Sequence, residues 1–456
     1  MSLNHSEARI EEIIRMLKVA KNGGGRVALL GALGAGMSCI GGLLLHEGVS
    51  LLGQDIRGGG DGCGYPVYKQ LSEKDFEGVV LCAYSLAIDK DDESYLAARR
   101  LGILTVSRAE LLGAICADYE NVICVAGTHG KSTTSAMLAH ILKYVGRTPT
   151  SLLGAVPIGG SALTVSDKRM LLLEACEYKD SFLQLTPDLC VLGALALDHT
   201  DYFASFDQYL SSFKRFCASA ETVVYNLESE GSVSASLECN GRRISYGTGE
   251  RCDFRYRIGG KSLDGMEYTL YYDNNCLHSY LPMIGEYNLK NLCGAIGAAS
   301  ALGVSVKDAA EALTSFLGVE RRMQRLYGLC SVPLIYDYAH HPEELLLAIS
   351  ELKALTDSLT VVFMPHTYSR TKSFFDEFAR ALSLADQCIL LDIYPAREEP
   401  IKGVSSEALA CAVGGGCLAT DEARCARLLR SVDRGAIALL GAGDMDRLFR
   451  ELKSFR

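Results

Sequence analysis

The chain has 456 residues, more than one hydrophobic core usually organises, so we expect two or three domains. A net charge of −10 at pH 7 without a long Lys or Arg run argues against a nucleic-acid-binding protein, and 48% hydrophobic with 22% charged residues is typical of a soluble globular one. The 17 cysteines form no C-x-x-C pair, which argues against a zinc site or disulfide framework and indicates reduced thiols in a cytoplasmic protein.

The start of the chain contains one uncharged segment that has the length of a membrane span. Val27–Leu45 carries no charge, but it contains five glycines and no similar segment follows, so we expect no span. Residues 1–18 lack the apolar stretch of a signal peptide. A strand followed by a glycine turn is the better interpretation: Arg26–Leu30 precedes Gly34 and Gly36.

Short apolar runs, most followed by polar or glycine clusters and then by helical patterns, recur along the chain. Uninterrupted apolar runs of this length are typical of strands buried on both faces, and their alternation with helices predicts an α/β fold with parallel sheets. Ligands of such sheets bind at the carboxyl ends of the strands. The predicted strands are Arg26–Leu30, Val79–Ala83, Val122–Ala126, Met170–Leu173, Leu189–Leu195, Thr222–Tyr225, Pro333–Tyr336, Thr360–Met364, Gln387–Leu391 and Ala436–Leu440.

The most informative motif joins the predicted strand Val122–Ala126 to the helical pattern Ala136–Tyr144. It reads Gly127-Thr-His-Gly-Lys131-Ser132-Thr-Thr, a shortened P-loop with Val125 where the strict pattern has glycine. Backbone N–H groups and the helix dipole of such a turn bind phosphate, Lys131 provides a cation for the β- and γ-phosphates, and Ser132 a hydroxyl ligand for Mg²⁺. The motif predicts an ATP site.

Two polar clusters follow the next predicted strands. Glu174 and Glu177 come after Met170–Leu173, and Asp198-His199 comes after Leu189–Leu195. A carboxylate and an imidazole beside a phosphate loop could hold the cations that phosphoryl transfer needs. Each cluster alone is more typical of a helix cap or a surface pair.

The stretch Cys252–Ile284 departs from the parallel pattern. Its apolar residues alternate with polar ones, and Gly259-Gly260 and Asp273-Asn274-Asn275 separate the runs, which predicts antiparallel hairpins inserted in a larger domain. Breaks near Asp118 and Gly318 suggest three domains, at residues 1–118, 119–318 and 319–456.

The order of these motifs resembles the Mur ligase family over most of the chain. After the P-loop and the two polar clusters the same order continues, and His340-His341-Pro342 and Pro365-His366 resemble the branch that adds the first amino acid. The further matching segments are Ser181-Phe-Leu183, Asn288-Leu-Lys-Asn291, Gly318–Arg322, Tyr336–Pro342, Pro365–Thr371, Tyr394–Glu398 and Gly441–Asp444.

The resemblance implies a Rossmann-like UDP-sugar-binding domain, a central P-loop-type ATPase domain carrying the antiparallel insert, and a Rossmann-like C-terminal amino-acid-binding domain. It implies a cytoplasmic enzyme of peptidoglycan precursor synthesis, with ATP and Mg²⁺, that joins L-alanine to the carboxylate of UDP-N-acetylmuramate through an acyl phosphate. In that reaction a carboxylate is phosphorylated by ATP and then attacked by an amine.

The resemblance also implies a role for each matching residue. The implied catalytic residues are Lys131, His199 and Arg370. The implied ATP-binding residues are Gly127, Thr128, His129, Gly130, Lys131, Ser132, Thr133, Asn288, Asn291, Arg322 and Asp337. The implied metal ligands are Ser132, Glu174 and His199. The implied substrate-binding residues are Gly34, Gly36, Asp55, Ser85 and Arg108 for the sugar nucleotide and Tyr338, His341, His366 and Arg370 for the amino acid. His199 and His341 are both candidates for the general base.

Three positions depart from the family pattern, and two alternatives stay open. Ala194 and Ala196 stand where Asn and Glu are usual, and Gln54 where Ser is usual. The same scaffold could join a preformed peptide to the sugar nucleotide, or the chain could be a non-catalytic relative that binds the nucleotide or ATP.

Overall fold

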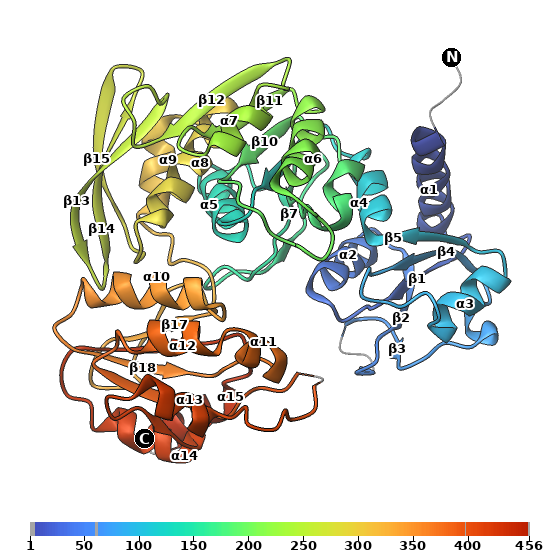
Figure 1. Cartoon of the computed structure of the whole chain (residues 1–456). Helices are drawn as coiled ribbons and strands as arrows, with labels where there is room; N and C mark the ends of the chain where they lie inside the picture. The colour runs from blue at the N-terminus through green and yellow to red at the C-terminus, as the bar shows by residue number, and fades with distance from the viewer. Residues whose placement is uncertain (1–4, 60–62, 397, 455–456) are drawn as a thin grey trace. The chain divides into compact units, whose positions relative to one another are not determined.

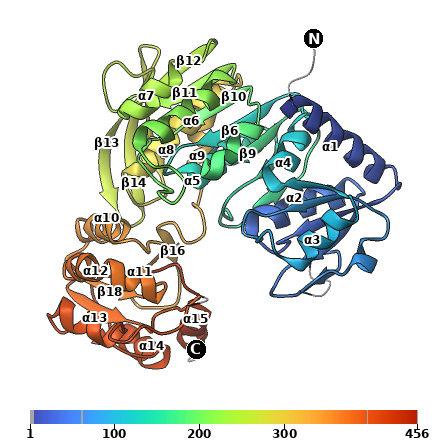
Figure 2. The ribbon, with the colours of Figure 1, turned by 45° about the vertical axis from the view of Figure 1, so that its right-hand side comes forward.

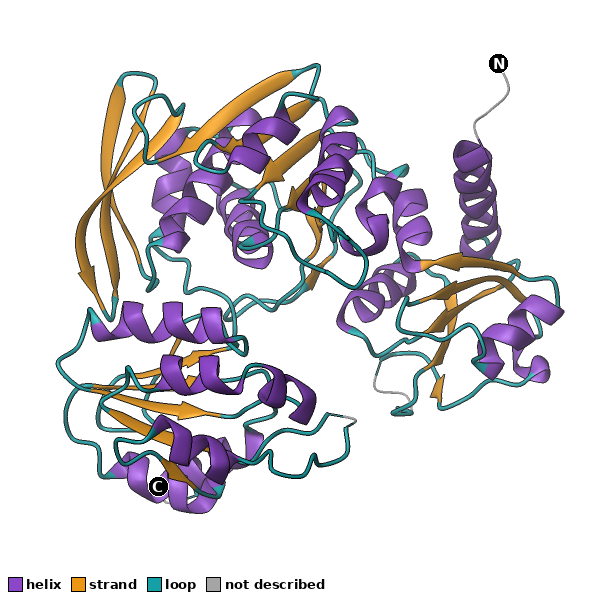
Figure 3. Ribbon diagram, in the orientation of Figure 1, coloured by secondary structure: helices purple, strands orange, loops and turns teal. Residues whose placement is uncertain are grey.

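The computed structural model describes residues 5–59, 63–396 and 398–454, in which the strands form three sheets, each flanked by helices (Figures 1 and 3). The chain divides into two compact units. The first unit comprises Met1–Arg257, Thr269–Ser279 and Leu289–Phe316, and the second comprises Ile258–Tyr268, Tyr280–Asn288 and Leu317–Arg456. The predicted α/β fold, with a P-loop sheet that lies between two Rossmann-like sheets in chain order, is confirmed.

The first sheet is parallel, with the order β3-β2-β1-β4-β5 of a dinucleotide-binding fold. Its strands are β1 (Arg26–Leu30), β2 (Ser50–Gln54), β3 (Val67–Tyr68), β4 (Val79–Tyr84) and β5 (Leu104–Ser107). The accompanying helices are α1 (His5–Lys21), α2 (Ala35–His46), η1 (Glu73–Phe76), α3 (Glu93–Arg100) and α4 (Arg108–Cys116). Val27–Leu45 is therefore a strand, a glycine turn and a helix, and none of the helices in the described ranges has the length and apolar content to cross a bilayer.

The central sheet has the order β15-β14-β13-β12-β11-β10-β6-β9-β7-β8, and Figure 2 shows β10, β6 and β9 side by side. Its strands are β6 (Val122–Ala126), β7 (Thr150–Leu152), β8 (Leu163–Thr164), β9 (Leu171–Glu174), β10 (Leu189–Leu192), β11 (Thr222–Asn226), β12 (Arg242–Gly247), β13 (Phe254–Ser262), β14 (Gly265–Tyr272) and β15 (Asn275–Leu281). Its helices are α5 (Lys131–Tyr144), η2 (Tyr178–Gln184), α6 (Phe206–Ala218), α7 (Glu230–Ser236), α8 (Tyr287–Ala301) and α9 (Val306–Leu313).

The predicted hairpin insert is present as β13, β14 and β15, but the first turn is not at Gly259-Gly260. Both glycines lie inside β13, and the turn falls at Leu263-Asp264. The prediction failed there because a glycine without a positive φ is compatible with extended backbone, so a pair of glycines does not by itself interrupt a strand. The second turn, at Asp273-Asn274, is as predicted, and both residues have positive φ.

The third sheet has the order β16-β17-β21-β18-β19-β20 and is parallel except for the edge strand β16. Its strands are β16 (Gln324–Leu326), β17 (Leu334–Asp337), β18 (Leu359–Phe363), β19 (Gln387–Leu390), β20 (Leu418–Ala419) and β21 (Ala436–Leu440). Its helices are α10 (Pro342–Lys353), α11 (Tyr368–Ser373), α12 (Phe375–Leu382), α13 (Ser406–Val413), α14 (Glu422–Arg430) and α15 (Asp446–Lys453).

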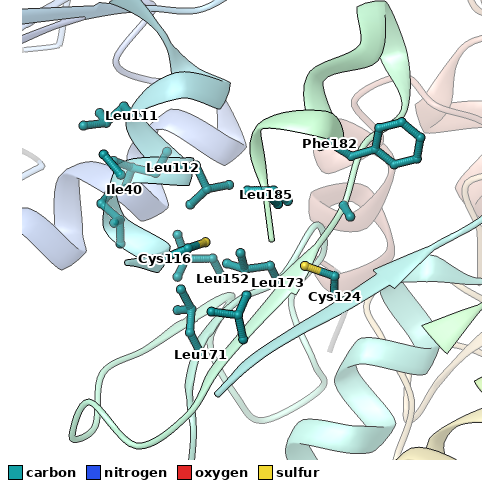
Figure 4. Close-up of a cluster of buried hydrophobic side chains, with 14 of the residues drawn as sticks. Ile40, Leu111, Leu112, Cys116, Cys124, Leu152, Leu171, Leu173, Phe182 and Leu185 are labelled. Atoms are coloured by element: carbon teal, nitrogen blue, oxygen red, sulfur yellow. The ribbon is translucent and has the colours of Figure 1, made fainter. Parts of the chain in front are cut away.

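Within the first unit, the first two sheets share one hydrophobic core (Figure 4). Leu111 and Cys116 of α4 belong to the same buried cluster as Leu171 of β9 and Phe182 of η2. The helices approach so closely that a Cβ at Gly113 of α4 would collide with the carbonyl oxygen of Gln184. The predicted boundary between residues 118 and 119 therefore does not separate two hydrophobic cores. The boundaries of the three domains remain a prediction.

Candidate active site

The P-loop leaves β6 and enters α5 as predicted. Gly127 and Gly130 have φ values of +128° and +81°, which favour glycine. A Cβ at Gly127 would lie 2.9 Å from the Gly193 backbone, and one at Gly130 would collide with Oδ1 of Asn291 in α8. Both glycines are therefore required by backbone angle and by space, and Asn291 lies against the loop. Lys131 is the first residue of α5, where a helix N-terminus attracts anions.

The ammonium group of Lys131 is bound to a buried carboxylate. Its Nζ donates to Glu177 Oε1 and Oε2 at 3.1 and 3.0 Å, and to the Gly127 carbonyl oxygen at 2.5 Å. The Glu177 side chain is 0% exposed and that of Lys131 15% exposed. A buried carboxylate is stable only when cations and hydrogen-bond donors satisfy it, so this pair fixes the position of the lysine.

A buried hydroxyl network connects Glu177 to the P-loop. The Tyr209 hydroxyl donates to Glu177 Oε1 at 3.3 Å and lies 2.8 Å from Thr128 Oγ1. Thr128 Oγ1 in turn accepts from Ala196 N at 2.9 Å. Burial and the Glu177 charge raise the pKa of Tyr209, so the phenol stays protonated and remains a donor. The network holds the loop, Glu177 and the segment that follows β10 in one arrangement.

Three residues form a candidate metal site beside Lys131. Ligand atoms of Glu177, Asp198 and His199 all lie within 4.8 Å of one another. His199 Nε2 is 3.8 Å from Glu177 Oε1, its ring lies 4.8 Å from that of Tyr178, and its φ is +52°. Carboxylate oxygens with an imidazole suit a hard or borderline divalent cation, so the residues present fit Mg²⁺.

The structure places Glu174, the glutamate predicted as a ligand, outside this group. Glu174 Oε2 accepts a hydrogen bond from Gly154 N at 3.0 Å. The family resemblance selected Glu174 and gave Glu177 no ligand role, so the ligand role of Glu174 stays a prediction and Glu177 is a further candidate. Ser132, one of the three predicted ligands, lies in the first turn of α5, and His129 in the loop is exposed.

The departures at Ala194 and Ala196 leave the loop supported through backbone atoms. Thr128 N donates to the Ala194 carbonyl oxygen at 3.0 Å, and Thr128 Oγ1 bonds the backbone of Ala196. Side chains at these two positions are therefore not needed to hold the P-loop. Gln54 is buried and its Nε2 donates to the Lys69 carbonyl oxygen at 3.1 Å.

The residues predicted for the sugar nucleotide gather around the glycine turn after β1. Asp55 Oδ2 accepts from Leu33 N at 3.0 Å, between β1 and α2. Burial opposes ionisation of Asp55, but hydrogen bonds from Arg57 and Leu33 prevail and its pKa is lowered. Arg108, at the start of α4, lies against Gly36: a Cβ there would be 2.6 Å from the guanidinium.

Ser85 and Gly34 lie at the same turn. A Cβ at Gly31 would be 3.0 Å from the Ser85 Cβ, and Gly34 is the N-cap of α2. The turn therefore combines a helix N-terminus with one guanidinium and one hydroxyl, which suits a phosphate-bearing ligand.

In the second unit, Asp337 lies at the end of β17. Asp337 is buried and accepts from Met323 N at 2.7 Å and Ala339 N at 2.8 Å. Burial raises its pKa. The Arg322 guanidinium lies 5.5 Å from the Tyr338 ring centre. The Nδ2 of Asn288 donates to the Ile284 carbonyl oxygen at 2.7 Å, so its side chain has a structural partner there.

The predicted amino-acid pocket brings together three of its four residues and two others. Arg370 Nη1 donates to His366 Nδ1 at 3.3 Å, and the His366 ring stacks on Tyr394 at 5.5 Å. The His340 ring lies between Tyr338 and His366, at 5.2 and 6.3 Å. His340 and Tyr394 were not among the predicted site residues, although both lie in segments that resemble the family, Tyr336–Pro342 and Tyr394–Glu398.

The fourth predicted residue, His341, is the N-cap of α10. Its ring packs against Phe374 at 4.7 Å instead of against the His366 group.

Comparisons with known proteins place this geometry in context. Residues 125–299 match the Mur ligase middle domain, and residues 321–445 match the Mur ligase glutamate ligase domain. The chain is 33% identical over 438 residues to a UDP-N-acetylmuramate–L-alanine ligase of Caldicellulosiruptor bescii, covering 92% of this chain and 96% of that one. It is 32% identical over 473 residues to the enzyme of the same name from Lachnospira eligens, covering 96% and 100%.

Solved structures agree in fold. The crystal structure of UDP-N-acetylmuramate-alanine ligase from Thermotoga maritima matches with a TM-score of 0.79 at 21% identity, covering 94% of this chain and all of that one. A murein peptide ligase from Psychrobacter arcticus matches with a TM-score of 0.66 at 19% identity, covering 95% and 100%.

Proposed function

This chain belongs to the Mur ligase family, and on that premise we propose that it is an ATP-dependent ligase that joins L-alanine to the carboxylate of UDP-N-acetylmuramate. The observation that carries the proposal within the structure is the Lys131–Glu177 pair at the P-loop, with Asp198 and His199 beside it. Such residues are those that phosphoryl transfer requires, because its catalysis consists mainly of positioning the reactants and neutralising their charge.

The P-loop residues bind and orient ATP. Backbone N–H groups at the N-terminus of α5 bind the phosphates, and Lys131 stabilises the negative charge that moves with the γ-phosphoryl group. Glu177, Asp198 and His199, with Ser132, would hold Mg²⁺, which supplies further positive charge when it is bound. Glu177 and Asp198 are thus added to the predicted ligands Ser132 and His199, and the ligand role of Glu174 stays a prediction.

The acceptor carboxylate is a poor electrophile because its leaving group would be oxide. Transfer of the γ-phosphoryl group gives an acyl phosphate, from which phosphate can leave when an amine attacks. Arg370 fits the carboxylate of the amino acid, because a guanidinium meets a carboxylate through two parallel hydrogen bonds. Lys131 belongs to the first unit and Arg370 to the second.

The glycine turn after β1 is the proposed site of the UDP pyrophosphate, with Arg108 as its cation and Ser85 as a further donor. We place the reaction in the cytoplasm, where ATP and the nucleotide sugar are available. The unpaired thiols among the described residues agree with a reducing compartment.

Phosphate release tests the proposal directly. ATP, Mg²⁺ and UDP-N-acetylmuramate are incubated with and without L-alanine, beside a Lys131→Ala control. Release that needs both substrates and disappears in the control supports the ligase. Replacing L-alanine by glycine, L-serine or a tripeptide fixes the amine: faster release with the tripeptide would assign the chain to peptide ligation. ATP binding without release under any of these conditions would make it a non-catalytic relative.

A further inference from the structure

Two cysteines lie side by side at the edge of the third sheet. Cys388 is in β19, and Cys417 immediately precedes β20. The parallel register pairs Ile389 with Leu418, which places Cys388 opposite Cys417. Cys417 is one of the partly buried side chains that pack against the hydrophobic cluster containing Cys388. Neighbouring strands are about 4.8 Å apart, which lies within the range of about 4.4–6.8 Å between the Cα atoms of disulfide-bonded cysteines.

The two thiols differ in access and in acidity. Cys388 is 7% exposed, whereas Cys417 is only half-buried. The neighbouring Cys388 thiol lowers the pKa of Cys417, whereas the Cys417 thiol and burial raise the pKa of Cys388. An accessible thiol with a lowered pKa is the nucleophile of thiol–disulfide exchange, and a neighbouring protected thiol is suited to resolve the product.

The surroundings of Cys417 give a small molecule access to its sulfur. A cavity of about 380 Å³ is lined by Cys417, Glu407 and the triglycine segment Gly414–Gly416. The three glycines have φ values of +68°, +60° and +85°, and no atom lies within 4 Å of where their Cβ atoms would be. This open, side-chain-free segment directly precedes Cys417, so the backbone can adjust when the sulfur changes its partner.

From this juxtaposition we propose that Cys388 and Cys417 are a thiol pair that forms a reversible disulfide by exchange with a small-molecule disulfide such as glutathione disulfide. The Cys417 thiolate attacks one sulfur of glutathione disulfide, forms a mixed disulfide and releases the first glutathione thiolate, which is protonated. Cys388 then loses its proton and attacks the Cys417 sulfur, releasing the second glutathione. Two protein thiols lose two electrons, and one glutathione disulfide becomes two glutathiones.

A second pair of cysteines in the chain provides an internal control. The neighbouring Cys217 of α6 raises the pKa of Cys190 of β10, and both cysteines are 0% exposed. Two neighbouring cysteines are therefore present at both places, but only the Cys388–Cys417 pair includes a partly exposed thiol, Cys417. If proximity alone were sufficient, both pairs would oxidise.

The test is a count of thiols in the native full-length protein. The protein is incubated with glutathione disulfide, acid-quenched, unfolded and alkylated with N-ethylmaleimide. We expect the number of alkylated cysteines to fall from 17 to 15, with a cross-linked peptide pair that contains Cys388 and Cys417. Dithiothreitol should restore all 17. Cys190 and Cys217 should remain alkylatable throughout.

Single variants separate the two roles. Cys388→Ser should stop at one glutathione adduct on Cys417, since the resolving thiol is gone, and Cys417→Ser should leave Cys388 unmodified over the same time. Cys411→Ser, an exposed cysteine that also lines the cavity, should still cross-link. If a variant does not fold, the wild-type peptide map decides alone. A stable adduct on wild-type Cys417, a Cys411–Cys417 cross-link, or 17 alkylated cysteines after oxidation would each overturn the proposal.

Discussion

Lys131 and Glu177 form an ion pair, with Nζ 3.0 Å from Oε2, in which the glutamate is fully buried. Glu177 also accepts from Tyr209 and lies 3.8 Å from His199 Nε2. One carboxylate thus connects the P-loop lysine to the candidate metal ligands. A bound phosphate would interact with Lys131, and a bound cation would interact with Glu177. Each would offset part of the charge that Lys131 and Glu177 present to each other, so phosphate and cation should favour each other's binding.

The first prediction concerns which glutamate serves the metal. Glu177→Gln should lower the rate of phosphate release about 100-fold or more, and raise the Mg²⁺ concentration needed for half-maximal rate, because a direct ligand matters at least as much as an outer partner. Glu174→Gln is the matched control and should change both by less than about tenfold. Mg²⁺ titrations of the two variants make the measurement. The reverse ranking would return the ligand role to Glu174.

The second prediction concerns the buried Tyr209 hydroxyl. Tyr209→Phe removes a donor to a charged carboxylate and should lower the free energy of unfolding by about 2 kcal/mol. It should also raise the KM for ATP, since Thr128 and Glu177 lose their link. Tyr246→Phe, whose buried hydroxyl donates to the Leu192 carbonyl oxygen at 3.2 Å, should lose about 1 kcal/mol without changing that KM. Urea unfolding and steady-state kinetics give both quantities; equal KM effects in the two variants would contradict the link.

The third prediction concerns Gly130, which has positive φ and faces Asn291 Oδ1. Gly130→Ala should destabilise the protein by about 3 kcal/mol, combining backbone strain with overpacking. Gly146→Ala, at φ +73° with no atom within 4 Å of its Cβ position, carries the strain alone and should lose about 1 kcal/mol. Asn291→Ala in the Gly130→Ala background should recover part of the difference. Additive effects in this double-mutant cycle would show that the clash is relieved elsewhere.

The fourth prediction is a decline of stability in mild acid. Burial lowers the pKa of His340, and burial with the Arg370 charge lowers that of His366. Glu344 opposes the shift of His340. In the unfolded chain both histidines have ordinary pKa values near 6.5, so they bind protons more tightly there than in the folded chain. Folding stability is therefore fully present above about pH 6.5 and is lost as the pH falls below that value. The free energy of unfolding should decrease from about pH 7.5 to about pH 5.5.

The matched variant for this decline is His340→Gln, which keeps a donor for the Tyr338 carbonyl oxygen, 3.0 Å from His340 Nδ1. The slope of stability against pH should be shallower in this variant. An unchanged slope in denaturant titrations at several pH values would assign the decline to other groups.

The fifth prediction concerns recognition of the amino acid. Arg370→Lys replaces a planar fork by a point charge and should raise the KM for L-alanine about 10–100-fold, while the KM for ATP stays unchanged. Arg380→Lys, on the exposed face of α12, is the control and should change neither. A rise in the KM for ATP instead would place Arg370 at the nucleotide.

The strands and the P-loop were predictable because their signals are local. β1, β6 and β21 begin and end where the apolar runs do, and the glycines of the loop are required by backbone angles. The choice between Glu174 and Glu177 was not local. Glu177 is followed by Lys179 and Asp180, both with positive φ, and Asp180 is held there by the hydroxyls of Tyr202 and Ser212. Which of the two carboxylates is buried thus depends on residues more than twenty positions away. The periodicity of apolar residues in the sequence contains no information about such contacts.

The cysteines also show one feature that was predictable from the sequence and one that was not. Scattered, unpaired spacing predicts free thiols, and the cysteines of the described residues are free in the structure. The juxtaposition of Cys388 and Cys417 depends on the register of two strands that a helix and a triglycine segment connect. Register is set by packing of the whole sheet, so sequence spacing gave no hint of it.

The hydrophobic core shared by the first two sheets limits which fragments of the protein can be produced in isolation. A recombinant fragment that starts at residue 119 would keep the P-loop and its ligands, but it would lack α4 and uncover Leu171, Phe182 and Leu185. Contiguous apolar surface of this kind promotes aggregation. A fragment made to study nucleotide binding should therefore retain the first sheet, even though that sheet is not part of the proposed ATP site.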